Sequence, residues 1–314
     1  MSTSGKRQSD GGRSRARRAI ALLVVIAACL VAVLIVLPRQ KETAGPAAYK
    51  PGEPADRQQP RPRQTDADAV ERPGPQTVEA AGKGRQERPL PRARIAVVID
   101  DVGYNLEELE AFLDFPGPIT LSVLPNLPYS EESARRVAEA GKELLLHLPM
   151  EAENGSDPGP GAILTSQNDE QIRRLLEASF SQVPQAAGMN NHMGSRATAD
   201  RRVMNVVMDY LKSNRRYFLD SRTTTKTLGP ETARAHAVPY LERDIFLDNE
   251  PHAEAIRQAL EEGIEVARKE GSAILIGHVC NPQIVEVIGG LLAELDRAGV
   301  ELVFLSDLLE EASS

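Results

Sequence analysis

A short apolar run that ends in two adjacent carboxylates constrains this chain more than any other feature. The segment IAVVIDDVGYN covers residues 95–105, and its Val- and Ile-rich part is typical of a strand buried on both faces of a parallel sheet. Neighbours on a regular strand point to opposite sides, so Asp100 and Asp101 can share one space only where the strand breaks, and Gly103 permits a break. Two buried carboxylates repel each other unless a cation lies between them or one is protonated. The segment therefore predicts a polar site at the end of a buried strand; the alternative is that one Asp caps the following helix.

Composition limits the partners that the folded part can have. The chain has 314 residues, of which 41% are hydrophobic and 4% aromatic, and it lacks Trp, so we expect no stacking surface for single-stranded nucleic acid. Residues 1–92 include 17 basic and 9 acidic residues, whereas the remainder includes 20 basic and 36 acidic ones. A region this acidic repels DNA and anionic lipid, so no nucleic-acid partner is expected.

The N-terminus indicates where the protein is located. A basic tail at residues 1–18 precedes AIALLVVIAACLVAVLIVL at residues 19–37, an uncharged run just long enough to cross a lipid bilayer as a helix. The charge bias places the tail in the cytoplasm and everything after the run outside it. We therefore predict a single-pass transmembrane signal anchor in a bacterial inner (plasma) membrane, with the C-terminal domain in the periplasm. A cleaved signal peptide is the alternative.

Two further regions follow the predicted anchor. Residues 38–92 are rich in Pro, Gly, Gln and charge and poor in aliphatic residues, which predicts a disordered, Pro-rich linker. Residues 93–314 alternate short apolar runs with amphipathic segments, which is typical of one α/β domain with a largely parallel sheet, either a barrel or an open sheet. The expected strands are residues 95–99, 119–124, 143–147, 217–219, 245–247, 273–276 and 302–305. The clearest expected helices are one with Ser130 as its N-cap and those at residues 169–183, 199–214 and 282–298.

Polar residues gather where the expected strands end. They occur in LHLPME at residues 146–151, DSRTT at 220–224, DN at 248–249 and GH at 277–278, and also in NNHMGSR at 190–196, between two expected helices. The carboxyl ends of parallel strands lie on one rim, where loops build an active site. His147, His192 and His278 are therefore candidate functional residues, whereas His236 and His252 are expected to be structural.

The residue types in these motifs are typical of a hydrolytic metal site. One Asp and two His with an open position are usual ligands of a divalent ion, most often zinc, which lowers the pKa of a bound water to about 7. A second Asp could accept the proton of that water, and a further His could protonate the leaving group. Arg196 and Arg222 suit a substrate carbonyl or carboxylate; the alternative is that they pair with acidic surface residues. Spacing alone does not assign these roles.

The same motifs carry a family resemblance. Residues 94–309 resemble the divergent polysaccharide deacetylase family, a distant branch of the NodB-like carbohydrate esterases, through IDDVGY, LHLPME, NNHMGSR, FLDSRTT, FLDN and IGH. The resemblance implies an irregular (β/α)7-type barrel that removes N- or O-acetyl groups from a glycan with a divalent metal, expected to be Zn2+. The expected partners are a glycan of the cell envelope, the lipid bilayer through the anchor, and envelope proteins.

The resemblance assigns most of the roles by position. Asp100 matches the catalytic base of the family, and Asp101 matches its metal-binding Asp. His147 matches the first His of the metal motif, and His278 matches the late His that assists the leaving group.

This chain departs from the broader superfamily at two motifs. The superfamily has a second metal-binding His four residues after the first, where this chain has Glu151, and NNHMGSR stands in the approximate place of its Arg-x-Pro loop. We predict His192 as the third metal ligand, with Glu151 as the alternative. The expected substrate-binding residues are Asn191, Arg196, Asp220 and Arg222.

The predicted function is a metal-dependent hydrolase that removes acetyl groups from an envelope glycan such as peptidoglycan. Two other functions fit parts of the pattern. A phosphohydrolase could use Asp100 or Asp101 as its nucleophile, and Lys226 is the candidate for the lysine that it needs. A catalytically silent scaffold could keep the deacetylase fold in order to bind peptidoglycan or a division partner.

Overall fold

The computed structural model describes residues 93–311. The predicted tail, transmembrane anchor and linker lie outside these residues, so the predictions for them stay predictions. Within the described part, no helix combines the length and the apolar character that crossing a membrane requires. Cys280 is a free, exposed cysteine.

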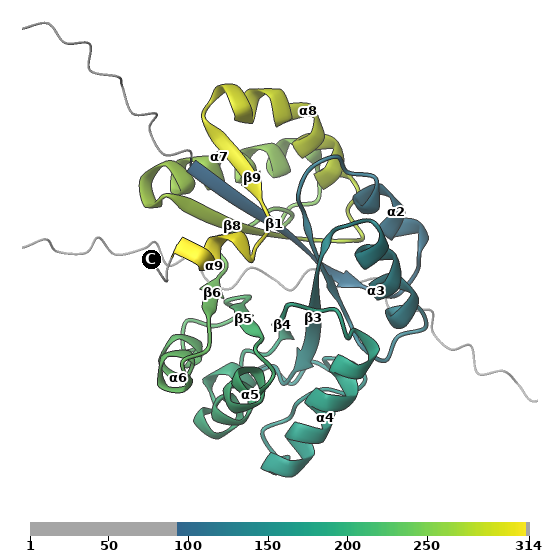
Figure 1. Cartoon of the computed structure of the whole chain (residues 1–314), viewed down its shortest axis with the longest axis vertical. Helices are drawn as coiled ribbons and strands as arrows, with labels where there is room; N and C mark the ends of the chain where they lie inside the picture. Colours follow the sequence, from purple (N-terminus) through teal and green to yellow (C-terminus); the bar gives the residue numbers. More distant parts are fainter. Residues whose placement is uncertain (1–92, 312–314) are drawn as a thin grey trace, which may run out of the picture. The chain divides into compact units, whose positions relative to one another are not determined.

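A parallel sheet forms the centre of the described region, with helices around it (Figure 1). Hydrogen bonding follows the order β6-β5-β4-β3-β2-β1-β8-β7, and β9 pairs with β1 as well. Every ladder is parallel, as the alternation of strands and helices predicted. The strands are β1 (Ala93–Val102), β2 (Thr120–Val123), β3 (Glu143–Met150), β4 (Gly188–Met193), β5 (Tyr217–Asp220), β6 (Tyr240–Glu242), β7 (Ile245–Phe246), β8 (Ser272–His278) and β9 (Val300–Val303).

The two outermost strands of the sheet are consecutive in the chain. Only Arg243 and Asp244 separate β6 from β7, yet β6 pairs with β5 and β7 pairs with β8. The two edge strands, β6 and β7, must therefore lie close together, which requires the sheet to curve. The result is a parallel α/β half-barrel. This confirms the predicted barrel in a coarser form. The sheet has nine strands rather than about seven because β4 and β6 were not expected.

Alternation along the strands separates two apolar layers. On β1, Ile95, Val97 and Ile99 face outward and belong to the large cluster that includes the helix residues. Ala96 and Val98 face the other way and belong to a small cluster of strand residues and C-terminal residues. The small cluster fills the interior of the half-barrel. The inward-facing residues that come next, toward the carboxyl ends of the strands, therefore line its mouth.

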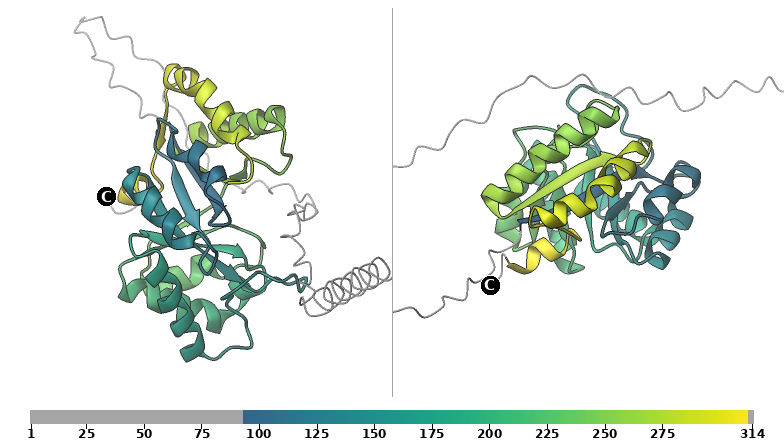
Figure 2. Two further views of the ribbon diagram at one scale, coloured as in Figure 1. Left: turned by 90° about the vertical axis from the view of Figure 1, so that its right-hand side faces the viewer. Right: turned by 90° about the horizontal axis from the view of Figure 1, so that it is seen from above.

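Helices cover the outer face of the sheet. Figure 2 shows α7 and α8 side by side, and both contact the half-barrel next to β8 and β9. The helices predicted at residues 169–183, 199–214 and 282–298 match α4, α5 and α8 to within two residues. The helices are α2 (Glu107–Leu113), α3 (Ser130–Glu139), α4 (Asp169–Gln182), α5 (Arg201–Ser213), α6 (Gly229–His236), α7 (Ala253–Glu270), α8 (Gln283–Arg297) and α9 (Asp307–Glu311), with a 3-10 turn at Ala197–Ala199.

Two local predictions were wrong. Ser130 is the first residue of α3 rather than its N-cap, because its hydroxyl closes the preceding turn: Oγ donates to the carbonyl oxygen of Leu124 at 2.6 Å and accepts from the N–H of Leu127 at 2.9 Å. Residues 188–193, which we expected between two helices, form the central strand β4. Its sequence GMNNHM hides the strand because central strands of parallel sheets are usually apolar.

Candidate metal centre and active site

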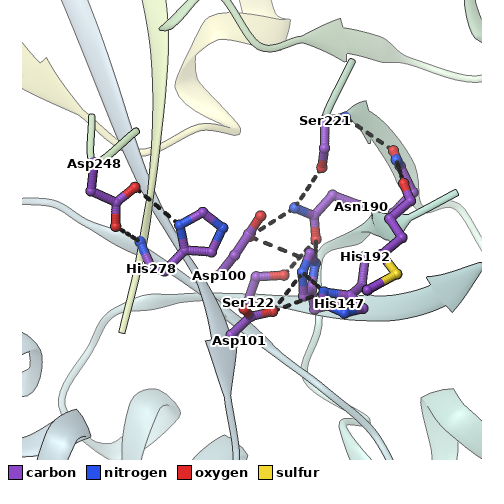
Figure 3. A network of polar contacts seen from close by, with 11 residues as sticks. Asp100, Asp101, Ser122, His147, Asn190, His192, Ser221, Asp248 and His278 are labelled. Carbon is purple, nitrogen blue, oxygen red and sulfur yellow. Dashed lines mark hydrogen bonds and ion pairs between the residues drawn. The ribbon is translucent and has the colours of Figure 1, made fainter. Parts of the chain in front are cut away.

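Inward-facing positions at the carboxyl ends of the strands carry polar residues instead of apolar ones (Figure 3). The register places Asp100 on β1 beside His278 on β8, and His147 on β3 beside Asn190 on β4. His192 follows Asn190 by two positions, so it lies on the same face of β4. The half-barrel thus brings together strand-end residues that are far apart in the sequence, as the motifs predicted.

Asp101 joins this group because β1 is irregular there. The register between β1 and β2 shifts between Ile99 and Val102, and Asp101 has a φ of 65°, a left-handed conformation that Asp tolerates better than most residues. Both carboxylates consequently face the same ring, with Oδ1 of Asp100 at 3.7 Å and Oδ1 of Asp101 at 3.2 Å from nitrogens of His147. The predicted strand break is present, but it lies at Asp101 itself.

Asp101, His147 and His192 form a cluster with the spacing of metal ligands. Oδ1 of Asp101 lies 3.2 Å from Nε2 of His147 and 2.9 Å from Nδ1 of His192, and the two ring nitrogens are 3.2 Å apart. One potential ligand atom from each residue lies within 4.8 Å of the other two. The structure therefore brings together the three residues that we predicted as metal ligands.

The cluster fits a divalent ion. Oδ1 of Asp101 is buried and has no hydrogen bond of acceptable geometry within residues 93–311, although two ring nitrogens lie close to it. A buried carboxylate oxygen without a donor is costly, and a cation held by all three ligand atoms would remove that cost. Two imidazoles and one carboxylate are also a ligand set that zinc has in hydrolases, with a further position open for water or substrate.

The two neighbouring carboxyl groups differ in proton affinity. At Asp101, burial raises the pKa, but the contacts with His147 and His192 outweigh burial and lower the pKa well below its ordinary value. At Asp100, burial prevails and raises the pKa, although His147 and His278 act in the opposite direction. Asp101 is therefore suited to bind a cation as a carboxylate, and Asp100 is suited to accept a proton.

The side chain of Asn190 contacts both Asp100 and His147. Its Nδ2 donates to Oδ1 of Asp100 at 2.8 Å and to Oγ of Ser221 at 3.2 Å. Its Oδ1 accepts from Oγ of Ser122 at 2.6 Å and lies 2.8 Å from Nδ1 of His147 (Figure 3). We assigned no role to Asn190 from the sequence. The signal that could have found it is strand alternation, because a strand at residues 188–193 puts Asn190 on the face of the predicted ligand His192.

His278 is held by Asp248 on the other side of Asp100 (Figure 3). Oδ2 of Asp248 accepts from the backbone N–H of His278 at 2.9 Å, and Oδ1 lies 3.0 Å from its ring Nδ1. Burial lowers the pKa of His278, but the bond to Asp248 and the charges of Asp248, Asp101 and Asp100 outweigh burial and raise it to about 9. The ring is therefore protonated at neutral pH, as a general acid needs to be.

The alternative third ligand, Glu151, does not reach the cluster. Its Oε2 accepts from the backbone N–H and the hydroxyl of Thr165 at 2.6 and 2.7 Å, and its Oε1 lies 3.5 Å from Arg196. Glu151 thus connects the loops after β3 and β4. The structure contradicts it as a metal ligand and favours His192.

Two of the expected substrate-binding residues are structural instead. The amide of Asn191 is buried; Nδ2 donates to the carbonyl of Met193 at 2.7 Å, and Oδ1 accepts from the N–H of Ser221 at 3.0 Å. Asp220 is fully buried, and its carboxylate accepts from the N–H of Arg222 at 2.8 Å and from two hydroxyls, those of Thr227 and Tyr240, at 2.6 and 3.1 Å. Both side chains are buried and each of their polar atoms already has a partner within the protein, so the structure favours a structural role for Asn191 and Asp220 over substrate binding.

The remaining polar candidates form ion pairs near the surface. Arg222 lies 3.2 Å from Glu242, and Arg196 pairs with Glu151 as described above. Their substrate-binding role stays a prediction. Lys226, the candidate lysine of a phosphohydrolase, pairs with Glu153 at 3.3 Å, and both of these side chains are exposed. Lys226 thus does not serve as the lysine that the phosphohydrolase hypothesis needs next to the carboxylates.

Arg243, between β6 and β7, is a neighbour of the site that sequence reasoning missed. Its guanidinium lies 3.8 Å over the ring of Phe246, and this ring stacks in turn on His278 with centroids 5.9 Å apart. Nε of Arg243 donates to the carbonyl of Ser221 at 2.9 Å. Burial lowers the pKa of Arg243 to about 10. We found no sequence signal for it, because its place depends on the chain passing directly between the two ends of the sheet.

Fold and site together define a parallel α/β half-barrel protein that carries, at the strand ends, a cluster of one carboxylate and two imidazoles with the spacing of metal ligands. Residues 97–309 match the family described as divergent polysaccharide deacetylase, and the chain belongs to this family. This confirms the resemblance that the motifs indicated.

Two relatives and one solved structure are similar to this chain. An uncharacterized protein of Haemophilus influenzae is 34% identical over 217 residues, which are 69% of this chain and 77% of that protein. The uncharacterized protein YibQ of Escherichia coli K12 is 34% identical over 223 residues, 71% of this chain and 69% of that protein. The crystal structure of the uncharacterized protein ATU2773 from Agrobacterium tumefaciens has the same fold, with a TM-score of 0.66 and 24% identity over 71% of this chain and 92% of that one.

Proposed function

We propose that this protein is a metal-dependent hydrolase that removes acetyl groups from an N-acetylated glycan of the cell envelope, such as peptidoglycan. The observation that carries the proposal is the arrangement around Asp100. The predicted ligands Asp101, His147 and His192 lie on one side of it, and the protonated His278 lies on the other. Membership of the divergent polysaccharide deacetylase family supports both the reaction and the class of substrate.

The residues of the site divide the reaction between them. A divalent ion held by Asp101, His147 and His192 would lower the pKa of a water to about 7 and polarise the acetyl carbonyl. Asp100 accepts the proton of the attacking water, and its raised pKa suits that step. His278 donates a proton to the departing amine or hydroxyl, and Asp248 keeps its ring oriented and charged.

The place of action is part of the same proposal. Residues 19–37 would anchor the protein in the inner membrane, and residues 38–92 would let the domain reach a glycan outside the cytoplasm. Arg196 and Arg222 are the substrate-binding residues that we retain, since both side chains stay partly exposed. A glycan-binding scaffold without activity, with envelope proteins as partners, is the competing proposal.

Acetate release tests the proposal directly. The full chain, purified in detergent and loaded with zinc, should release acetate from N-acetylated chito-oligosaccharides or from peptidoglycan fragments. The variant Asp100→Asn should keep its zinc and lose about 10²–10⁴-fold in turnover, the usual contribution of a positioned base. Zinc binding without acetate release from any of these substrates would leave only the scaffold.

A further inference from the structure

We infer that Asn190 is a positioning residue that ties the metal ligand His147 to the base Asp100: its amide oxygen keeps the proton of His147 on Nδ1, and its NH2 group holds the Asp100 carboxylate. The part about Asp100 rests on the catalytic step of the proposed function. The part about His147 rests on its metal site alone, whether or not acetate is released.

The strands place Asn190 for this role. The register puts Asn190 on β4 directly beside His147 on β3, and both side chains are buried, Asn190 completely. Buried amides are held in one orientation when both of their ends are bonded. Here Nδ2 faces the carboxylate of Asp100 and Oδ1 faces the hydroxyl of Ser122. A reversed amide would place its oxygen against a carboxylate oxygen, so the orientation follows from the contact with Asp100.

The orientation of the amide sets the tautomer of His147. An amide oxygen can only accept, so the ring nitrogen at 2.8 Å from it, Nδ1, must carry the proton. The lone pair of the neutral ring is then on Nε2. This is the atom that lies 3.2 Å from Oδ1 of Asp101 and 3.2 Å from Nδ1 of His192. Asn190 therefore presents the lone pair of His147 to the other two ligands.

The same amide keeps the ligand and the base apart. Nδ1 of His147 lies 3.7 Å from Oδ1 of Asp100, beyond hydrogen-bonding distance, while the oxygen of Asn190 is closer to it. Without Asn190, the carboxylate of Asp100 would be the nearest acceptor for the proton on Nδ1 of His147. Asp100 would then be hydrogen-bonded to His147 and less able to act as the base. One neutral side chain thus satisfies both groups, and it adds no charge to a site with two carboxylates.

Three variants of the full chain separate the two halves of the inference. Asn190→Leu removes both contacts. Asn190→Asp keeps an acceptor for His147 and replaces the donor to Asp100 by a like charge. Ser221→Ala is the matched control, because it removes a different partner of the same NH2 group and leaves Oδ1 in place.

The first readout is zinc affinity, measured by competition with a chromogenic chelator. Asn190→Leu should bind zinc about 10–100-fold more weakly, as is usual when the partner of a metal-binding His is lost. Asn190→Asp and Ser221→Ala should bind zinc as tightly as the unchanged protein. Asn190→Asp should nevertheless lose about 10²-fold in the turnover of acetate release without a change in KM, because its base is misplaced. Thermal unfolding checks that each variant is folded.

The second readout needs no substitution. The chain has five histidines, so ring-15N labelling gives a spectrum in which His147 can be assigned. In the zinc-loaded protein, Nδ1 of His147 should be protonated and Nε2 bound to metal. A proton on Nε2, or zinc affinity in Asn190→Leu equal to that of Ser221→Ala, would overturn the inference even if acetate is released. Absence of acetate release with both zinc results intact would overturn the proposed function and leave the role of Asn190 toward His147 standing.

Discussion

Glu151 lies four residues after His147, yet its carboxylate does not join the cluster of Asp101, His147 and His192 and binds Thr165 instead. β3 ends at Met150, so the chain leaves the sheet just before Glu151. His192 reaches the cluster from the neighbouring strand β4 instead. In the proposed metal site, the third ligand thus comes from a second strand rather than from the segment that follows His147.

This arrangement predicts opposite results for two acidic residues. Asp101→Asn should abolish zinc binding and acetate release, because it replaces a charged ligand by a neutral one. Glu151→Gln should keep its zinc, because Glu151 has no contact with the cluster. Metal analysis after gel filtration checks both variants. Zinc retained at full occupancy in Asp101→Asn would show that our ligand assignment is wrong.

The pair of Asp248 and His278 predicts how turnover depends on pH. His278 has to be protonated to act as the acid, so activity should fall as the pH rises through its pKa, which is about 9 in the metal-free protein. Asp248→Asn removes the main group that raises this pKa, so the basic limb of the profile should move to lower pH. The profile of kcat/KM for acetate release measures the shift. An unmoved basic limb would exclude His278 as the group that titrates there.

The same pair predicts a pH dependence of stability in protein treated with a chelator. The pKa of His278 is about 9 in the folded protein, above its ordinary value of 6.5. The protonated ring therefore adds its full contribution to the free energy of unfolding below about pH 6.5, and this contribution disappears as the pH rises through 9. A pKa difference of this size corresponds to a contribution of at most about 3 kcal/mol. Urea unfolding of Asp248→Asn should show a weaker loss between these pH values than the unchanged protein.

An exposed pair of the same chemistry is the control for this measurement. Nε2 of His252 lies 3.2 Å from Glu250, and both side chains are mostly exposed. Solvent screens such a pair, so Glu250→Gln should leave the curve of stability against pH unchanged. Equal effects of Asp248→Asn and Glu250→Gln would mean that the buried pair has no special role in stability.

Two glycines predict stability changes of opposite sign. A Cβ on Gly188 would lie 2.6 Å from the carbonyl oxygen of Tyr217 and 2.8 Å from its ring, so Gly188→Ala should destabilise the domain by about 1–3 kcal/mol and disturb β4. Gly289 lies in α8, and a Cβ there would meet no neighbouring atom within 4 Å, so Gly289→Ala should stabilise the domain by about 0.5–1 kcal/mol. Chemical denaturation measures both changes, and a neutral Gly188→Ala would contradict the close approach of β4 and β5.

The parts of the fold that could be predicted from the sequence are those with an unambiguous period. The strand before Asp100 and the helix α4 could be predicted from the local sequence alone, because a continuous apolar run indicates a buried strand and amphipathic spacing indicates a helix. β4 could not be recognised in this way. Its inward-facing side chains, Asn190 and His192, are polar because they belong to the candidate site. The apolar residues that would mark a strand are therefore missing at these positions.

The candidate site was predictable to a similar degree. Residues at strand ends could be grouped because parallel strands bring their carboxyl ends to one rim. Which side chain faces which depends on register and on the direction of each loop, and the sequence does not contain these directly. Asp220 and Glu151 stand at the expected positions, but their carboxylates accept hydrogen bonds from neighbouring hydroxyl and N–H groups. Arg243 depends on a connection between sheet edges that only the folded chain reveals.

The left-handed backbone at Asp101 keeps the two carboxylates of the site close to each other when the half-barrel moves. On a regular strand, one of two successive side chains would be among the helices, and the base and the ligand would have to come from separate segments that move independently as the half-barrel fluctuates. Here one peptide unit joins Asp100 to Asp101, so any displacement of β1 carries both carboxylates together. The proposed proton acceptor and the proposed metal ligand therefore stay neighbours when β1 moves, and packing has only to set the torsions of their two side chains.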